Sequence, residues 1–323
     1  MRVVTCRQFG PLDDLVVEER ESAPVREGFV RIDVRAAGVN YVDGLFVQGL
    51  YQIKPPTPFV PGGEIAGVVS EVGPGVTDRH IGQRVFCSTG LGGFASEVVV
   101  PASRAIPTPD AMTDGQAATF VQSYMTAWFA LRVRARAEAG QWLLVLGAGG
   151  GVGLAAVDVG ASMGLHVIAA ASSEAKRAIA TERGAEAVID TLADDLKERA
   201  RQISGRGVDL VYDPVGGEMA ETALRSLCDD GQYLVVGFAG GSIPRLPANQ
   251  ILLRNRRVTG VDWGGWIGSH VDQNAQMLAD VTAAVARGDL HPVEPVAYPL
   301  EKVAEALADQ VGRRVVGKTV LVP

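Results

Sequence analysis

The sequence is poor in the residues that most often bind metals or form cross-links. Among 323 residues there are three cysteines and four histidines. The cysteines (Cys6, Cys87 and Cys228) stand far apart, and none of them has the paired spacing of a zinc cluster. Isolated cysteines of this kind also do not form a disulfide framework. The composition therefore predicts neither a metal cluster nor a cross-linked secreted domain.

Long apolar runs and an excess of positive charge are missing as well. The longest weakly polar stretch, 143–161, is interrupted by glycines and an aspartate, so it is not a candidate membrane span. Residues 1–6 show no charged region followed by a long apolar stretch, as a signal peptide would. The formal net charge of −7 gives no general attraction to nucleic acid or to anionic membranes. We expect a cytoplasmic protein without nucleic-acid or membrane partners.

Glycine, by contrast, is abundant. The chain contains 39 glycines without a collagen-like repeat, so they serve turns, tight packing or close approach to a ligand. The length of 323 residues exceeds what one hydrophobic core usually supports. We therefore expect two domains.

The chain changes character after residue 109. Before it, short apolar or alternating segments separated by glycine and proline predict a β-rich domain with strands at 30–36, 65–69, 84–87 and 95–100. A helix is expected at 117–131. Strands then alternate with helices: strands at 142–146, 165–170, 187–189, 208–212 and 233–236, and helices at 153–163, 174–183, 192–203 and 218–227. This alternation predicts a parallel, doubly wound α/β sheet that binds ligands beyond the carboxyl ends of its strands. The tail predicts helices at 273–285 and 300–310, and a last strand at 319–322 that rejoins the β-rich domain.

The strongest local signal is the glycine-rich segment 147–153, which follows a strand and opens a helix. It fits A-x-G-x-x-G or G-x-x-G-x-x-G rather than the strict G-x-G-x-x-G pattern. Either version brings backbone N–H groups and a helix N-terminus onto a pyrophosphate. The alternative, a flexible loop without a ligand, does not account for the strand–loop–helix context. Loops 213–217 and 237–241 follow the fourth and fifth strands at the same edge. The predicted cofactor-binding residues in these loops are Gly149, Gly150, Gly151, Val152, Gly153, Pro214, Val215, Gly237, Phe238 and Ala239.

The end of the second strand bears on the choice between NADPH and NADH. The position where an acid would bind the ribose of NADH holds no Asp. Ser172, Ser173 and Lys176 instead offer hydrogen bonds and a positive charge to a 2′-phosphate, with Arg177 able to replace Lys176. We therefore favour NADPH. In the alternative, Glu174 binds the ribose of NADH, and the basic residues belong to an ordinary exposed helix.

Several segments, taken together and in order, resemble the zinc-free quinone oxidoreductase branch of the medium-chain dehydrogenase/reductase superfamily. Besides the glycine loop they are AAGVN at 36–40 with Asp43, GLY at 49–51, PGGEIAGVV at 61–69, Thr126-Ala127, DPVGG at 213–217 and GKTVL at 317–321. The resemblance implies a GroES-like catalytic domain (1–118 and 269–323) split by a Rossmann domain (119–268), with NADPH in the cleft between them. It also implies a homodimer, for which the edge strand at 257–261 is the candidate interface.

The resemblance also assigns roles to individual side chains. Asn40 is expected to orient the nicotinamide or the substrate, and Thr126 and Lys318 are expected to be further cofactor contacts. Tyr51 and Tyr124 match aromatic positions of the family and are expected to line the site or to donate a hydrogen bond. The alternative for both tyrosines is simple packing.

The positions of the zinc ligands point to the reaction. Zinc-containing members have Cys where this chain has Asn40 and His where it has Gly63, so the resemblance implies that no metal is bound. Without a Lewis acid, alcohol dehydrogenation is not expected, whereas a conjugated acceptor needs less activation. We expect NADPH-dependent hydride transfer to a quinone. The alternatives are a reductase of activated C=C bonds in α,β-unsaturated carbonyls (enoyl-CoA, acrylyl-CoA or haloacrylate type) and a non-catalytic, crystallin-like NADPH-binding protein.

Overall fold

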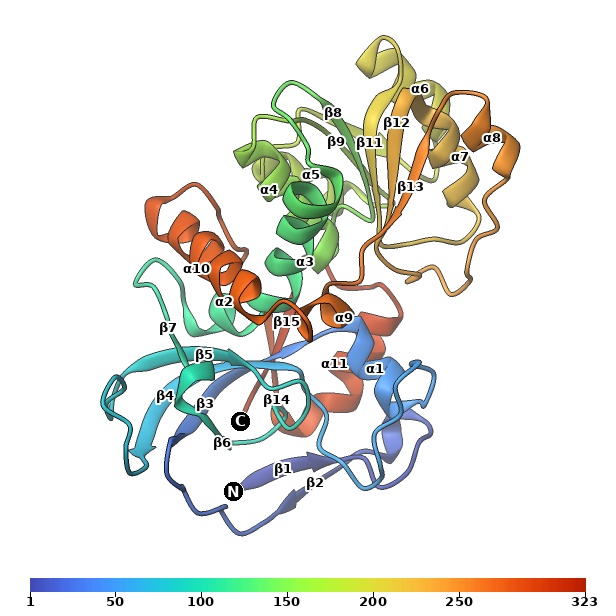
Figure 1. Ribbon diagram of the computed structural model, residues 1–323. Coiled ribbons are helices and arrows are strands. Elements are labelled where there is room, and N and C mark those ends of the chain that lie inside the picture. The colour runs from blue at the N-terminus through green and yellow to red at the C-terminus, as the bar shows by residue number, and fades with distance from the viewer. The chain divides into compact units, whose positions relative to one another are not determined.

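The computed structural model describes residues 1–323, and the chain forms two compact units (Figure 1). The first unit comprises Met1–Gln122 and Pro292–Pro323, and the second comprises Ser123–His291. The second unit is thus inserted into the first. None of the helices combines the length and the apolar character that a membrane span requires.

The first unit contains a seven-stranded sheet and a separate two-stranded ribbon. The sheet order is β14-β15-β3-β4-β5-β7, with β6 paired to β3, and the ribbon is β1-β2. The strands are β1 (Arg2–Thr5), β2 (Val16–Glu19), β3 (Phe29–Val39), β4 (Glu64–Val72), β5 (Arg84–Ser88), β6 (Glu97–Pro101), β7 (Ile106–Pro107), β14 (Val296–Pro299) and β15 (Thr319–Val322). As expected, the last strand rejoins this unit, where β15 runs antiparallel to β3.

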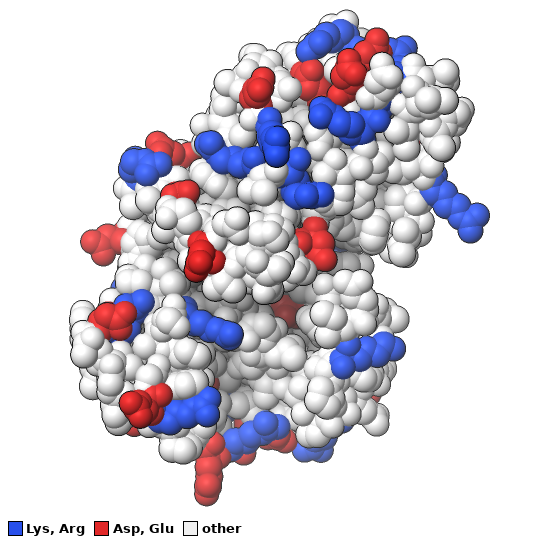
Figure 2. All heavy atoms as spheres, in the orientation of Figure 1, with Lys and Arg blue, Asp and Glu red and all other residues white.

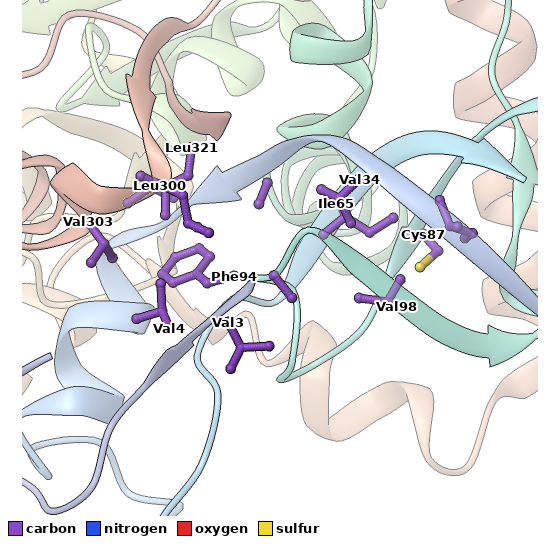
Figure 3. Packing of buried hydrophobic residues seen from close by; sticks show 14 of the residues in the cluster. Val3, Val4, Val34, Ile65, Cys87, Phe94, Val98, Leu300, Val303 and Leu321 are labelled. Carbon is purple, nitrogen blue, oxygen red and sulfur yellow. The ribbon is translucent and has the colours of Figure 1, made fainter. Parts of the chain in front are cut away.

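The core of the first unit brings together residues from both of its chain segments (Figure 3). Val4 of β1, Ile65 of β4 and Phe94 are fully buried beside Leu300 and Leu321 from the returning segment. Alternating residues of β3 point into this core, which is why its first half reads as apolar and polar in turn. Burial of these side chains holds the returning segment in the first unit.

The second unit is a six-stranded parallel sheet in the order β10-β9-β8-β11-β12-β13. Its strands are β8 (Trp142–Leu146), β9 (His166–Ala171), β10 (Ala187–Asp190), β11 (Val208–Asp213), β12 (Leu227–Val235) and β13 (Arg257–Gly260). Helices α4 and α5 cover one face and α6 and α7 the other (Figure 1). This is the doubly wound arrangement predicted from the alternation of strands and helices, and its chain order reverses beside β8.

The helices complete the two units. They are α1 (Tyr41–Val47), α2 (Asp114–Ala118), α3 (Thr126–Trp128), α4 (Gly151–Ser162), α5 (Glu174–Glu182), α6 (Leu196–Ser204), α7 (Met219–Ser226), α8 (Ala248–Leu252), α9 (Trp263–Ile267), α10 (Val271–Arg287) and α11 (Val303–Val311). There are three 3-10 helices, η1 (Leu12–Asp14), η2 (Ala102–Arg104) and η5 (Leu300–Lys302). Two further segments, η3 (Val121–Met125) and η4 (Phe129–Ala135), are π-helical.

Three local features differ from the sequence expectations. The helix expected at 117–131 is divided into α2, η3, α3 and η4. The helix expected to end at residue 227 ends at Ser226, and β12 begins at once. Helices α1, α8 and α9 were not expected, because segments of five to seven residues are too short to show a helical period.

The boundary between the units also differs. We expected the first unit to resume at residue 269, but it resumes at Pro292, so that α10 belongs to the second unit. Two hydrogen bonds connect this segment to the second unit. Trp263 Nε1 donates to Asn274 Oδ1 of α10 at 2.9 Å, and the His291 amide donates to Asp158 Oδ2 of α4 at 2.7 Å.

Candidate functional site

The glycine loop between β8 and α4 is tightly closed. The Gly150 amide donates to the Gly147 carbonyl at 3.0 Å. A Cβ atom on Gly153 would lie 2.3 Å from the same carbonyl oxygen, so no other residue fits there without moving the backbone. Because the first N–H groups of an α-helix have no intrahelical acceptor, the amides of Gly151 and Val152 at the start of α4 are suited to an anion.

A second loop is organised by one buried carboxylate, Asp213 at the end of β11. Its Oδ1 atom accepts hydrogen bonds from the amides of Val215 at 2.7 Å and Gly216 at 2.8 Å. Its Oδ2 atom accepts from the hydroxyl of Tyr233 on β12. Burial raises the pKa of Asp213, and these three hydrogen bonds oppose that rise by stabilising the carboxylate. Asp213 therefore fixes the backbone that carries Pro214 and Val215.

The three glycine-rich loops lie side by side at the carboxyl edge of the sheet. The Ala239 amide donates to the Pro214 carbonyl at 3.1 Å, and the Gly240 amide donates to the Val215 carbonyl at 2.6 Å. The Val215 side chain in turn lies 2.9 Å from the position that a Cβ on Gly147 would take. The structure thus brings together the loops that the sequence placed at this edge.

The turn after β9 contributes the groups considered for a 2′-phosphate. Ser173 caps the start of α5, where its Oγ atom accepts from the Lys176 backbone amide at 3.4 Å. A Cβ on Gly149 would lie 2.3 Å from the Lys176 Cβ, so the stem of Lys176 runs against the glycine loop. Ser172 and Glu174 are exposed.

Arg177, considered as a substitute for Lys176, is already engaged. Its guanidinium pairs with Asp190 at 3.0 Å and donates to the Ala171 carbonyl at 3.1 Å. The Arg177 guanidinium is therefore held at the ends of β9 and β10.

The first unit contains a buried polar cluster at the start of α1. Asn40 Oδ1 accepts from Lys318 Nζ at 2.7 Å, and Asn40 Nδ2 donates to Glu64 Oε1 at 2.9 Å. Lys318 Nζ is 3.5 Å from the same Glu64 oxygen. The Asn40 amide donates to Asp43 Oδ2 at 2.8 Å. All four side chains are buried. Asn40 and Lys318, which the sequence assigned separately, are in direct contact.

This cluster does not fit a zinc ion. Catalytic zinc takes three protein ligands, usually His, Cys or carboxylate. Here Gly63 has no side chain, and Glu64 is paired with an ammonium group that would repel a cation. No group of three His, Cys, Asp or Glu side chains suited to a metal occurs in the structure.

Tyr51, Tyr124 and Thr126 were also predicted for the site. Tyr51 is half-buried, with its ring 4.8 Å from that of Phe46. Tyr124 belongs to the second unit, where its hydroxyl donates to Asp158 Oδ2 at 2.6 Å. Burial and the adjacent Asp158 carboxylate raise the pKa of Tyr124 well above its usual value. Thr126 is buried at the start of α3.

Sequence reasoning missed three buried residues that organise these sites, namely Glu64, Asp158 and Tyr233. Two of them carried a visible signal. Glu64 opens an apolar strand, and Asp158 is the one charged residue in α4. A charged residue in such a setting is usually paired. Tyr233 had no such signal, because a tyrosine in a buried strand is ordinary.

Surface charge is mixed. On the face drawn in Figure 2, both units carry basic and acidic side chains, and most of them stand singly or in small groups. The net charge of −7 is therefore not gathered into one tract on this face.

Comparison with known proteins identifies the fold and the family. Residues 26–110 match the family model of the alcohol dehydrogenase GroES-like domain, and residues 151–281 match that of zinc-binding dehydrogenases. The quinone oxidoreductase-like protein 2 of Bos taurus is 36% identical over 309 residues, which cover 95% of this chain and 88% of the relative.

Solved structures also match along the whole chain, two oxidoreductases among them. A probable oxidoreductase from Mycobacterium abscessus is 35% identical with a TM-score of 0.89, covering 100% of this chain and 99% of the other. The Escherichia coli quinone oxidoreductase, solved with NADPH, is 27% identical with a TM-score of 0.89 and covers 100% of both chains. The fold is accordingly a GroES-like domain combined with a Rossmann-type parallel sheet. The chain belongs to the quinone oxidoreductase branch of the medium-chain dehydrogenase/reductase superfamily.

Proposed function

We propose that this protein is an NADPH-dependent, zinc-independent reductase that transfers a hydride to a quinone. The observation that carries the proposal is the set of three loops at the carboxyl edge of the second unit's sheet, with Lys176 against the first of them. The NADPH complex of the Escherichia coli relative, which shares the fold along the whole chain, supports the choice of cofactor.

Each part of the loop set has a proposed role in holding the cofactor. Gly149, Gly150, Gly151, Val152 and Gly153 are proposed to surround the pyrophosphate, with the amides of Gly151 and Val152 as donors where the start of α4 favours negative charge. Ser172, Ser173 and Lys176 are proposed for the 2′-phosphate, which needs donors and a positive charge. Further cofactor contacts are proposed for Thr126, Pro214, Val215, Gly237, Phe238 and Ala239.

Bound NADPH supplies the hydride, and the protein supplies position. Asn40 is proposed to donate a hydrogen bond at the reacting end of the site, with Tyr51 as a further candidate. Tyr124, whose hydroxyl donates to Asp158, is proposed only to line the site. Reduction of a quinone to a hydroquinone also takes up a proton, for which water is a sufficient source. The main catalytic effect is then to hold the two reacting carbon centres close and in line.

An acceptor panel tests the proposal. NADPH and NADH oxidation would be followed with 1,4-benzoquinone, 1,4-naphthoquinone and trans-2-hexenal. We expect turnover with the quinones and a clear preference for NADPH. Turnover of the enal alone would favour the reductase of activated C=C bonds. Tight NADPH binding without turnover of any acceptor would contradict the reductase and favour a non-catalytic binding protein.

We further propose a homodimer through β13 and a location in the cytoplasm. The edge strand β13 is paired with β12 on one side, and Val258 on it is 39% exposed. An edge strand with exposed apolar side chains is suited to pairing with a second copy. The three cysteines are free and buried, as is usual in a reducing compartment.

A further inference from the structure

The side-chain amide of Asn40 lies between two opposite charges. Its carbonyl oxygen accepts from the Lys318 ammonium at 2.7 Å, and its nitrogen donates to the Glu64 carboxylate at 2.9 Å. If the amide were turned over, its N–H groups would face the ammonium and its oxygen would face the carboxylate. Only one of the two orientations therefore satisfies both neighbours.

The register of the sheet builds this arrangement. Asn40 directly follows β3, while Glu64 begins β4 and Lys318 precedes β15, the two strands that flank the end of β3. Glu64 lies opposite Gly38, and Thr319 lies opposite Val39. The charged side chains thus reach Asn40 from both sides of the strand that carries it.

The Glu64 carboxylate is itself held in place. Its Oε2 atom accepts from the Gln122 amide at 3.0 Å, while Oε1 accepts from Asn40. Both Glu64 and Lys318 are nearly inaccessible, at 2% and 5% exposure. Separating a buried charged group from its partner costs much free energy. The side-chain amide of Asn40, which is hydrogen-bonded to both Glu64 and Lys318, therefore has little freedom to rotate.

The fixed amide leaves one group unused. Asn40 Nδ2 carries two hydrogens, and Glu64 accepts one of them. The second has no acceptor within the protein. A fixed N–H donor of this kind suits a carbonyl oxygen, on which negative charge develops when a quinone accepts a hydride.

We infer that Lys318 and Glu64 are positioning residues that fix the Asn40 amide so that it presents an N–H donor to the carbonyl oxygen of the acceptor. This inference rests on the proposed reductase function. It gives Lys318 a role through Asn40, in place of the direct cofactor contact expected from the sequence.

A double-mutant cycle tests the inference with Lys318→Met, Asn40→Ala and the combined variant. We expect each single change to lower kcat with 1,4-naphthoquinone by about tenfold or more, as the loss of one oriented hydrogen bond predicts. The combined variant should be no slower than Asn40→Ala, because Lys318 acts only through that amide. If the losses of kcat in the two single variants multiply in the combined variant, the inference is overturned.

Binding measurements separate the two roles of Lys318. The Kd for NADPH, from a fluorescence titration, should change by no more than about twofold in Lys318→Met. A large rise in that Kd with kcat unchanged at saturation would instead show a direct cofactor contact and overturn the inference. Lys318→Arg, which keeps a cationic donor, should restore part of the lost kcat.

Two further variants control for folding. Glu64→Gln/Lys318→Met removes both buried charges together, so it avoids an unpaired carboxylate and should show the same loss of kcat. Lys302→Met removes an exposed lysine of the same unit and should leave kcat unchanged. If the wild type reduces no acceptor, the proposed function fails. In that case the Kd of each variant for 1,4-naphthoquinone, measured by quenching of tryptophan fluorescence, replaces kcat in the double-mutant cycle. Independent effects of Lys318 and Asn40 on that Kd would overturn the inference separately.

Discussion

At the scale of single residues, one buried carboxyl group makes the stability of the first unit depend on pH. Asp43 is 1% exposed, and its carboxyl group accepts a hydrogen bond from the backbone amide of Asn40. Burial raises its pKa from 3.8 to about 7, and the nearby Glu64 carboxylate adds to the rise while Lys318 opposes it. The native state therefore holds a proton on Asp43 at a pH where the unfolded chain has lost it.

The pH dependence of stability follows from this difference. Between about pH 4 and pH 7 the native state binds more protons than the unfolded state at this group. The contribution of Asp43 to the free energy of unfolding is therefore full below pH 3.8 and is lost as the pH rises through about 7. Urea unfolding from pH 4 to pH 8 would measure it. Asp43→Asn keeps an acceptor without the titration and should flatten the profile; identical profiles in the two proteins would contradict the assignment.

Lys176 gives a second prediction at this scale. If it binds the 2′-phosphate, Lys176→Ala should raise the KM for NADPH by about tenfold or more, since a hydrogen bond to a charged group is lost. The KM for NADH, which lacks that phosphate, should change little. Lys197→Ala, on α6, is the matched control and should leave both values unchanged. Equal effects of Lys176→Ala on the two cofactors would remove the proposed role.

At the scale of elements, the β8–loop–α4 unit depends on one close approach. A Cβ on Gly153 would lie 2.3 Å from the Gly147 carbonyl, whereas a Cβ on Gly150 would lie 3.5 Å from it, an ordinary contact. We therefore expect Gly153→Ala to lower the free energy of unfolding by roughly 2 kcal/mol. Gly150→Ala, three residues away, should change it by less than about 1 kcal/mol. Thermal unfolding of the two cofactor-free proteins checks this, and equal stabilities would show that the loop adapts.

At this scale the sequence predicted the sheet and its loops but not the contacts between distant segments. The alternation of apolar strands and helices predicted the parallel sheet, because burial on both faces leaves a strong pattern. The three loops at its carboxyl edge followed from that topology. The Glu64–Asn40–Lys318 contact did not, because it joins residues from three distant segments through the register of β15, β3 and β4. No local pattern encodes such a register. The grouping of α10 with the second unit was not expected for the same reason, since Trp263–Asn274 and His291–Asp158 are tertiary contacts.

At the scale of the whole molecule, the proposed dimer gives a prediction about mass in solution. Val258→Lys places a charge on the edge strand β13, where charged side chains oppose pairing between sheets. Light scattering after gel filtration should give the mass of two chains for the wild type and of one chain for Val258→Lys. Val271→Lys, at an exposed valine on α10, should stay dimeric. A wild-type mass of one chain would contradict the proposed interface.

The two bonds made by Asp158 have a consequence for how the chain can be cut and joined. Tyr124, next to the first residue of the second unit, and His291, its last residue, both bond the same carboxylate oxygen. The inserted unit therefore begins and ends near one residue of α4, the helix that follows the glycine loop. A segment whose ends meet can be excised, closed with a short linker or transplanted without stretching its fold. Asp158 therefore holds together the two ends of the compact unit Ser123–His291.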